Sequence, residues 1–162
     1  MHDIYLSLGS NIGDRMANLA LALDHLRTGI VVDRVSSYYE TDPVDYTDQD
    51  PFINLAVRGR TDLAPEELLS FTQSIEMGMK RIKTIRYGPR VIDIDILLYD
   101  DIAYKSERLE IPHPKMLQRA FVLVPLLEIE PMLKIRGNLI SKLPAAMETQ
   151  GVRRLPGKEG EA

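Results

Sequence analysis

The start of the chain changes from a strand pattern to a helix pattern. Apolar and polar residues alternate over residues 3–8, which predicts a half-buried strand. Apolar residues then return at helical spacing over residues 14–27, at Leu19, Leu23 and Leu26. This spacing predicts an amphipathic helix. The first two elements are therefore expected to be a strand and a helix.

The middle of the chain repeats these patterns with one additional strand. Residues 30–41 are rich in β-branched and aromatic residues and predict a single strand. Residues 42–51 are polar, with a proline near each end, and predict a loop. Alternation over residues 52–60 predicts a third strand, and residues 63–78 predict a second helix with Pro65 in its first turn. The buried stripe of this helix is expected to be Leu68, Ile75 and Met79.

The pattern becomes weaker toward the end of the chain. Residues 80–90 are basic and predict a loop, and residues 91–99 predict a fourth strand. Beyond them, the sequence predicts only a helical turn over residues 114–120, followed by an apolar stretch at 121–129. The basic end of the chain, from residue 152, is expected to fray.

The predicted order of elements is strand, helix, strand, strand, helix, strand. This βαββαβ order is that of ferredoxin-like folds, an α+β class with a mainly antiparallel sheet and helices packed on one face. The 162 residues suit a single domain. We expect its core over residues 1–135 and a partly flexible C-terminal extension over residues 136–162. Many activities share this fold class, so the function has to be inferred from particular residues.

Composition narrows the class of partner. The formal net charge of −4 and the pI near 5.4 argue against binding to nucleic acid through phosphate contacts. The chain has no cysteine, which excludes disulfides and thiolate metal sites. No apolar run approaches the roughly 20 residues that cross a bilayer, and the first residues lack a signal-peptide pattern. We therefore expect a cytoplasmic protein that binds neither nucleic acid nor membranes. We also expect it to be a monomer.

Two carboxylates interrupt the apolar fourth strand. Asp93 and Asp95 share one face of this strand, roughly 7 Å apart along it, because side chains alternate between faces. An unpaired buried carboxylate is costly, and aspartate is depleted in strands. A Mg²⁺ ion fits this arrangement, since it is usually held by one or two carboxylates together with substrate phosphates. The alternatives are an exposed polar face, or salt bridges to Arg86 and Arg90.

A basic loop precedes this strand. It contains Lys80, Arg81, Lys83, Arg86 and Arg90, with no acidic residue between positions 77 and 92. A metal ion and a basic cluster repel one another, but both can bind the oxygens of a polyphosphate. Further phosphate-compatible donors are Arg108, His113 and Arg119. The alternative for the loop is a solvated basic segment.

Three segments resemble a known family. "YLSLGSNIGDR", "GPRVIDIDILLYD" and "IPHPKMLQRAFVLVPL" are similar to those of the 6-hydroxymethyl-7,8-dihydropterin pyrophosphokinase family of folate biosynthesis, and the resemblance covers residues 4–135. It implies transfer of the β,γ-diphosphate of ATP to the hydroxymethyl oxygen of 6-hydroxymethyl-7,8-dihydropterin, with release of AMP. It also implies two Mg²⁺ ions, bound with ATP by Asp93 and Asp95.

The resemblance also implies the other site residues. Phosphate-contacting, catalytic roles fall on Arg90, Lys80 and Arg81. The nucleotide-contacting positions are Gln73, Glu76, Arg86, Ile96, Arg108, His113 and Arg119. The pterin would stack between Phe52 and Phe121, with its amide-like edge bound by Asn54 and by the backbone of Thr41 and Val44. The family often has tryptophan at the position of Tyr87, and a loop one residue longer in some members leaves the alignment of Lys80 and Arg81 open.

Two other functions are compatible with the predicted topology. The first is a ferredoxin-like regulatory or RNA-binding domain. RNA binders of this kind carry aromatic residues on central strands and a basic charge balance, and the sequence shows neither feature, so this function is disfavoured. A different Mg²⁺-dependent phosphoryl transferase could reuse the pterin pocket. Release of AMP rather than ADP distinguishes a pyrophosphokinase from an ordinary kinase.

Overall fold

A computed structural model of the chain describes residues 1–43, 48–79, 91–147 and 151–156. Its centre is an antiparallel sheet with the strand order β10-β3-β4-β1-β5, in which β2 also pairs with β4. The strands of this sheet are β1 (His2–Ser10), β2 (Val31–Val35), β3 (Tyr39–Thr41), β4 (Phe52–Thr61), β5 (Asp93–Tyr99) and β10 (Val152–Arg154). The order β1-α1-β2/β3-β4-α2-β5 confirms the predicted ferredoxin-like βαββαβ arrangement.

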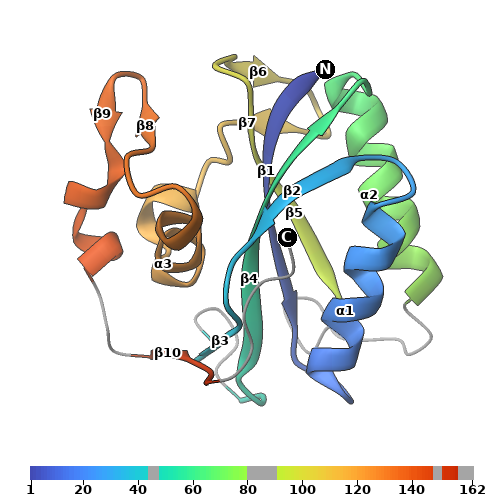
Figure 1. Ribbon diagram of the computed structural model, residues 1–162, viewed down its shortest axis with the longest axis vertical. Coiled ribbons are helices and arrows are strands. Elements are labelled where there is room, and N and C mark those ends of the chain that lie inside the picture. The colour runs from blue at the N-terminus through green and yellow to red at the C-terminus, as the bar shows by residue number, and fades with distance from the viewer. Residues whose placement is uncertain (44–47, 80–90, 148–150, 157–162) are drawn as a thin grey trace.

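Helices cover both faces of this sheet (Figure 1). Helices α1 (Arg15–Leu26) and α2 (Pro65–Met79) lie on one face, and α3 (Ala120–Ile129) lies on the other. The Asp14 side chain accepts a hydrogen bond from the backbone N–H of Ala17 and so caps α1. Among the described residues, no helix has the length and apolar character needed to cross a membrane. The prediction of helices on one face is correct for α1 and α2, and α3 is an addition to it.

Short elements follow the predicted core elements. The hairpin strands are β6 (Tyr104–Lys105) with β7 (Glu110–Ile111), and β8 (Lys134–Ile135) with β9 (Asn138–Leu139). The 3₁₀ turns are η1 (Met116–Gln118), η2 (Ile140–Lys142) and η3 (Pro144–Met147). The turn predicted over residues 114–120 therefore corresponds to η1.

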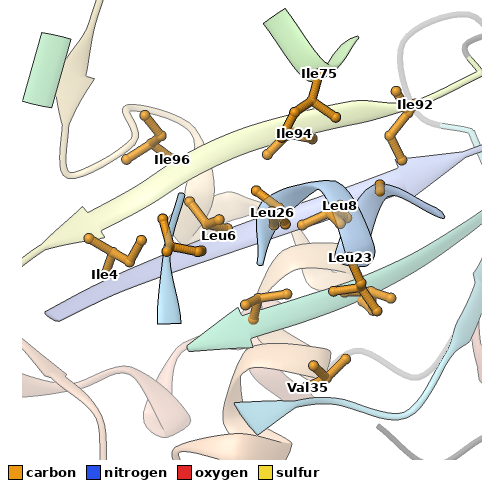
Figure 2. Packing of buried hydrophobic residues seen from close by; sticks show 14 of the residues in the cluster. Ile4, Leu6, Leu8, Leu23, Leu26, Val35, Ile75, Ile92, Ile94 and Ile96 are labelled. Carbon is orange, nitrogen blue, oxygen red and sulfur yellow. The ribbon is translucent and has the colours of Figure 1, made fainter. Parts of the chain in front are cut away.

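The main core lies between the sheet and helices α1 and α2. Figure 2 shows apolar side chains on the helix-covered side of β1 and β5 packing against α1 and α2. They are Ile4, Leu6 and Leu8 of β1, Ile94 and Ile96 of β5 with Ile92 just before it, Leu23 and Leu26 of α1, and Ile75 of α2. Because β5 buries its isoleucines on this side, Asp93 and Asp95 face the opposite side. A second cluster under α3 contains Ala56, Leu97, Leu98, Val122, Leu123 and Leu126.

A β-bulge divides β5 into two halves. Leu6 of β1 pairs with Ile96, whereas Tyr5 pairs with Leu98, so that Leu97 is the additional residue. Both Leu97 and Leu98 belong to the cluster under α3. The side of the sheet that carries the carboxylates at one end of β5 is therefore apolar at the other end.

The single strand expected over residues 30–41 is two strands, β2 and β3. Between them, the Ser36 hydroxyl accepts a hydrogen bond from the backbone N–H of Ala56 at 2.9 Å. The backbone N–H and hydroxyl of Ser37 donate to the Glu128 carboxylate of α3, at 3.0 and 2.8 Å to the same oxygen. Serine side chains thus replace regular strand pairing at this point.

The last described segment also differs from its prediction. Instead of fraying, residues 152–154 form β10, an edge strand antiparallel to β3. The next residue, Leu155, donates its backbone N–H to the Tyr38 carbonyl at 2.8 Å, and its side chain packs against the main core. Residues 157–162, the end of the predicted frayed segment, lie outside the described residues.

Candidate active site

The predicted metal-binding carboxylates lie on the face of β5 that is turned away from α1 and α2. Asp95 is opposite Ser7 of β1 and Asp93 is opposite Gly9, and both aspartates are half-buried. Burial raises the pKa of Asp95, while the positive charge of Arg119 acts in the opposite direction. An aspartate in this position is therefore destabilised in its charged form, and a bound cation would relieve that destabilisation.

Three predicted nucleotide residues lie along or beside α2. The Glu76 carboxylate accepts a hydrogen bond from the backbone N–H of Ile94 at 2.8 Å, which places α2 beside the carboxylate-bearing strand. Gln73 accepts a hydrogen bond from the Arg108 guanidinium at 3.1 Å, and Glu66 lies 3.6 Å from the same side chain. The structure therefore brings Gln73, Glu76 and Arg108 to one edge of the sheet.

Ile96 is placed differently from the other predicted nucleotide residues. Its side chain is 3% exposed and belongs to the main core under α1 and α2. The side chain therefore lies on the opposite face from Asp93 and Asp95. Any contact of Ile96 with a nucleotide would have to come from its backbone.

His113 and Arg119 lie close to one another and to β5, since the charge of Arg119 acts on both His113 and Asp95. The backbone N–H of His113 donates to the Leu97 carbonyl of β5 at 3.0 Å. Burial lowers the pKa of His113, and the positive charges of Arg119 and Lys115 lower it further. The backbone N–H of Lys115 donates to Nδ1 of His113 at 3.2 Å, which assigns the proton of the neutral ring to Nε2. The imidazole thus offers one N–H donor.

The predicted pterin residues of the sheet form a tightly packed pair. Asn54 of β4 is 4% exposed, and its amide nitrogen donates to the Thr41 hydroxyl of β3 at 3.0 Å. Asn54 lies opposite Gly9 of β1, where a Cβ atom would come within 2.5 Å of the Asn54 side-chain oxygen. A side chain at position 9 would therefore displace the Asn54 amide from the position in which it donates to Thr41.

The two predicted stacking residues start neighbouring elements. Phe52 is the first residue of β4 and Phe121 is the second residue of α3, and both are half-buried. The guanidinium carbon of Arg119 lies 5.4 Å from the centre of the Phe121 ring, a cation–π geometry. Arg119 therefore contacts the predicted pterin residue Phe121 and electrostatically influences both Asp95 and His113.

Two residues near the start of the chain hold the segment before Phe52. The Asn11 amide donates to the Gln49 side chain at 2.7 Å and to the Asp50 carbonyl at 3.1 Å. The Arg15 guanidinium donates to the Pro51 carbonyl at 2.9 Å. No role for Gly9, Asn11 or Arg15 was predicted from the sequence, although the "LGSN" segment contains the first two. Their partners are distant in sequence, so no local pattern indicated these contacts.

A groove lies beside this site rather than over the carboxylates. It has a volume of about 1020 Å³ and lies among the β6–β7 hairpin, the segment around His113 and the β8–β9 hairpin. Its lining includes four cationic side chains, Lys105, Lys134, Arg136 and Lys142. Of the predicted site residues, it shares only His113 within the described part of the chain.

Comparison with known proteins identifies the family to which the chain belongs. Residues 5–131 match the family described as 7,8-dihydro-6-hydroxymethylpterin-pyrophosphokinase, abbreviated HPPK. The chain belongs to the HPPK family. It is therefore an enzyme of folate biosynthesis that transfers a pyrophosphoryl group to hydroxymethyldihydropterin.

Bacterial HPPK relatives match most of the chain. The 2-amino-4-hydroxy-6-hydroxymethyldihydropteridine pyrophosphokinase of Bacillus subtilis is 51% identical over 127 residues, which are 77% of this chain and 76% of the relative. The enzyme of the same name from Methylorubrum extorquens is 47% identical over 93% of this chain and 97% of the relative. The match with the second enzyme reaches into the C-terminal extension.

A solved HPPK structure shares the fold. The crystal structure of wild-type Plasmodium falciparum HPPK-DHPS with SDX-DHP has a TM-score of 0.68 and 20% sequence identity. The match covers 88% of this chain and 43% of that protein, so the chain spans less than half of the two-part relative. At this identity, the likeness shows the shared fold alone.

Five predicted HPPK site residues fall outside the described part of the chain. They are Val44, Lys80, Arg81, Arg86 and Arg90. Their assigned roles in binding the pterin and the phosphates stay predictions, as does the alternative that the basic loop is solvated.

Proposed function

We propose that this HPPK binds ATP over Asp93 and Asp95, and the pterin over Thr41, Phe52, Asn54 and Phe121. The observation that carries the proposal is one row of residues across the sheet. Gly9 of β1 pairs with Asp93 on one side and with Asn54 on the other. Because neighbouring strands lie about 4.8 Å apart, Asp93 and Asn54 are separated by ~10 Å on the same face. This spacing suits a phosphate chain beside a fused-ring substrate.

The two carboxylates fit a magnesium site. They provide hard oxygen ligands, and Asp95 is destabilised by burial in its charged form. No cluster of three or more acidic or histidine side chains suited to a metal occurs among the described residues. Mg²⁺ suits such an incomplete set, because substrate phosphates and water complete its shell. Bound there with ATP, two Mg²⁺ ions would supply positive charge that offsets repulsion between the phosphate chain and the attacking oxygen.

The chain's own residues bind and orient the two substrates. Asn54 and Thr41 recognise the polar edge of the pterin, while Phe52 and Phe121 pack against its ring faces, a contact worth about 0.5–1.5 kcal/mol beyond area burial. Arg119 and the Nε2–H of His113 donate to phosphate oxygens. Holding both substrates on one rigid sheet face aligns the hydroxymethyl oxygen for attack on the β-phosphorus of ATP.

Product identity tests this function. The purified chain is incubated with ATP, Mg²⁺ and 6-hydroxymethyl-7,8-dihydropterin, and the nucleotides are separated by ion-exchange chromatography. We expect AMP and the pterin diphosphate in equal amounts. Formation of ADP would instead show transfer of a single phosphoryl group and overturn the proposal.

The same proposal includes the domain organisation, the location and the oligomeric state of the chain. We propose that residues 1–162 form a single pyrophosphokinase domain that acts as a cytoplasmic monomer. The shared sheet supports the single domain, because β10 of the C-terminal extension pairs with β3 of the core. Sedimentation equilibrium tests the monomeric state, for which a dimer mass would be the contrary result.

A further inference from the structure

The C-terminal strand β10 lies beyond residue 131, where the match to the HPPK family ends. It nevertheless lies next to the pterin residues, as the edge strand beside β3 (Figure 1). In this pairing, Val152 is opposite Thr41 and Arg153 is opposite Glu40. The extension therefore contributes a strand to the part of the sheet that carries Thr41.

Hydrogen bonds join β10 to the chain on both sides of β3. The backbone N–H of Asp42 donates to the Gly151 carbonyl at 2.8 Å, and the backbone N–H of Leu155 donates to the Tyr38 carbonyl at 2.8 Å. These bonds lie just beyond the two ends of β3, which is only three residues long. A strand this short has few pairing bonds of its own with β4, so β10 restricts its movement.

An ion-pair network strengthens the same junction. The Arg153 guanidinium donates to the Asp42 carboxylate at 3.0 Å and to one oxygen of Glu40 at 3.4 Å. The other oxygen of Glu40 accepts from Arg15 at 3.0 Å, and Arg15 also binds the Pro51 carbonyl just before Phe52. The network therefore connects β10 to both segments that border the pterin residues.

We propose that β10 positions the pterin pocket, by fixing the backbone of Thr41 and Asp42 and, through Thr41, the amide of Asn54. Thr41 is 2% exposed, and its hydroxyl accepts the hydrogen bond from Asn54, so a shift of β3 moves both groups. The inference rests on the proposed placement of the pterin against these residues. Gly151 and Arg153 are positioning residues in this account, since neither is assigned a contact with substrate.

Two glycines provide a matched pair of variants. Gly151 has a φ angle of +77°, and a Cβ atom there would lie 3.2 Å from the Asp42 carboxylate. Gly137, in the β8–β9 hairpin, has a φ angle of +82° with no atom within 4 Å of its Cβ position. Gly151→Ala and Gly137→Ala therefore introduce similar backbone strain. Only Gly151→Ala also brings a new methyl group close to Asp42, the residue that follows Thr41.

The experiment measures substrate affinities of the full chain by calorimetry. The probes are 6-hydroxymethylpterin, in the presence of Mg²⁺ and a non-hydrolysable ATP analogue, and that analogue alone. We expect Gly151→Ala and Arg153→Ala to weaken pterin binding about tenfold, with nucleotide binding changed less than about twofold. Gly137→Ala should leave both affinities unchanged. Thermal unfolding of all variants verifies that they are folded, and Arg153→Ala remains informative if Gly151→Ala is not.

Asn54→Ala, measured in parallel, separates this inference from the proposed pterin site. Unchanged pterin affinity in Asn54→Ala would overturn the placement of the pterin itself. If Asn54→Ala weakens pterin binding while Gly151→Ala and Arg153→Ala behave like Gly137→Ala, the positioning role of β10 is wrong. Equal losses of pterin and nucleotide affinity in the β10 variants would show general loosening of the fold and would also overturn it.

Discussion

Asp95 is an acidic residue on a half-buried strand position, where aspartate is uncommon and burial disfavours its charged form. Burial raises its pKa, which means that the folded chain tolerates the neutral form better than the charged form. Such a residue decreases the stability of the ligand-free protein. Its presence is explained if a cation binds there during turnover.

Asp95→Asn is expected to separate activity from stability. Loss of a magnesium ligand should lower turnover on the order of a thousandfold, because several kcal/mol of transition-state stabilisation are lost. The melting temperature without Mg²⁺ and nucleotide should stay the same or rise, since an unfavourable buried charge is removed. Steady-state kinetics and thermal unfolding measure the two effects. Nearly native turnover, or a marked fall in melting temperature, would contradict the metal-binding role.

Gly9 links the two proposed substrate positions through its lack of a side chain. In Gly9→Ala, the new Cβ atom would meet the Asn54 side-chain oxygen at 2.5 Å, so the amide has to move. We expect pterin affinity to fall at least about tenfold, with a smaller change in nucleotide affinity. Gly78→Ala in α2 is the control, because nothing lies within 4 Å of its Cβ position. Equal pterin affinity in both variants would show that the orientation of Asn54 is unimportant.

Helix α3 joins the site to the interruption between β2 and β3. Its start carries Phe121, and near its end Glu128 accepts hydrogen bonds from Ser37 and from the Tyr39 hydroxyl, the latter at 2.7 Å. No helical period reveals α3 in the sequence, because the helix is almost entirely apolar and contains Pro125. It forms because the sheet and η3 bury it, and tertiary contacts compensate for the missing N–H of the proline.

Glu128→Ala tests whether this helix supports the interrupted strand. The substitution removes the hydrogen bonds that Glu128 accepts from Ser37 and Tyr39, so the free energy of unfolding should fall by about 3 kcal/mol. Glu107→Ala, at an exposed position, should change it by less than about 0.5 kcal/mol. Urea unfolding compares the two. Similar values for both variants would mean that the Glu128 hydrogen bonds contribute little.

Tyr5 connects β1 to the end of α3 and makes stability depend on pH. Its hydroxyl donates to the Glu130 carboxylate at 3.0 Å. Burial and this hydrogen bond raise the pKa of Tyr5 to about 12. The folded chain therefore keeps the phenol proton where the unfolded chain, with a tyrosine pKa of about 10, has lost it. The unfolded state binds fewer protons in this range, so stability falls as pH rises from about 10 to about 12.

Tyr5→Phe isolates this contribution. Urea unfolding of both proteins at several pH values between about 9 and about 12 should show a steeper loss of stability for the native chain. Absorbance titration should show one fewer phenol ionising near the upper limit. Parallel stability curves would indicate that the Tyr5–Glu130 hydrogen bond does not persist in solution.

The sequence predicted those parts of the whole molecule whose structure depends on local periodicity. Helices α1 and α2 and strands β1, β4 and β5 have regular apolar spacing, and the alternation in β5 correctly placed Asp93 and Asp95 on one face. Strand β10, the break after β2 and helix α3 depend on partners far away in the chain. The same applies to Gly9 and Asn11, whose roles require Asn54 and Gln49.

The bulge at Leu97 has a consequence for substitutions in β5. Before the bulge, Asp93 and Asp95 point to the side of the sheet that α1 and α2 do not cover. After the bulge, the even-numbered Leu98 occupies that side and belongs to the α3 cluster. The alternation of side chains between the two faces of β5 therefore shifts by one residue at Leu97. Deleting Leu97 would remove the bulge and make the pairing with β1 regular. Residues on one side of the deletion would then shift by one position along β1, so that either the leucine or the carboxylates would face the wrong side of the sheet. The number of residues in the hydrophobic half of β5 is therefore tied to the position of the acidic pair.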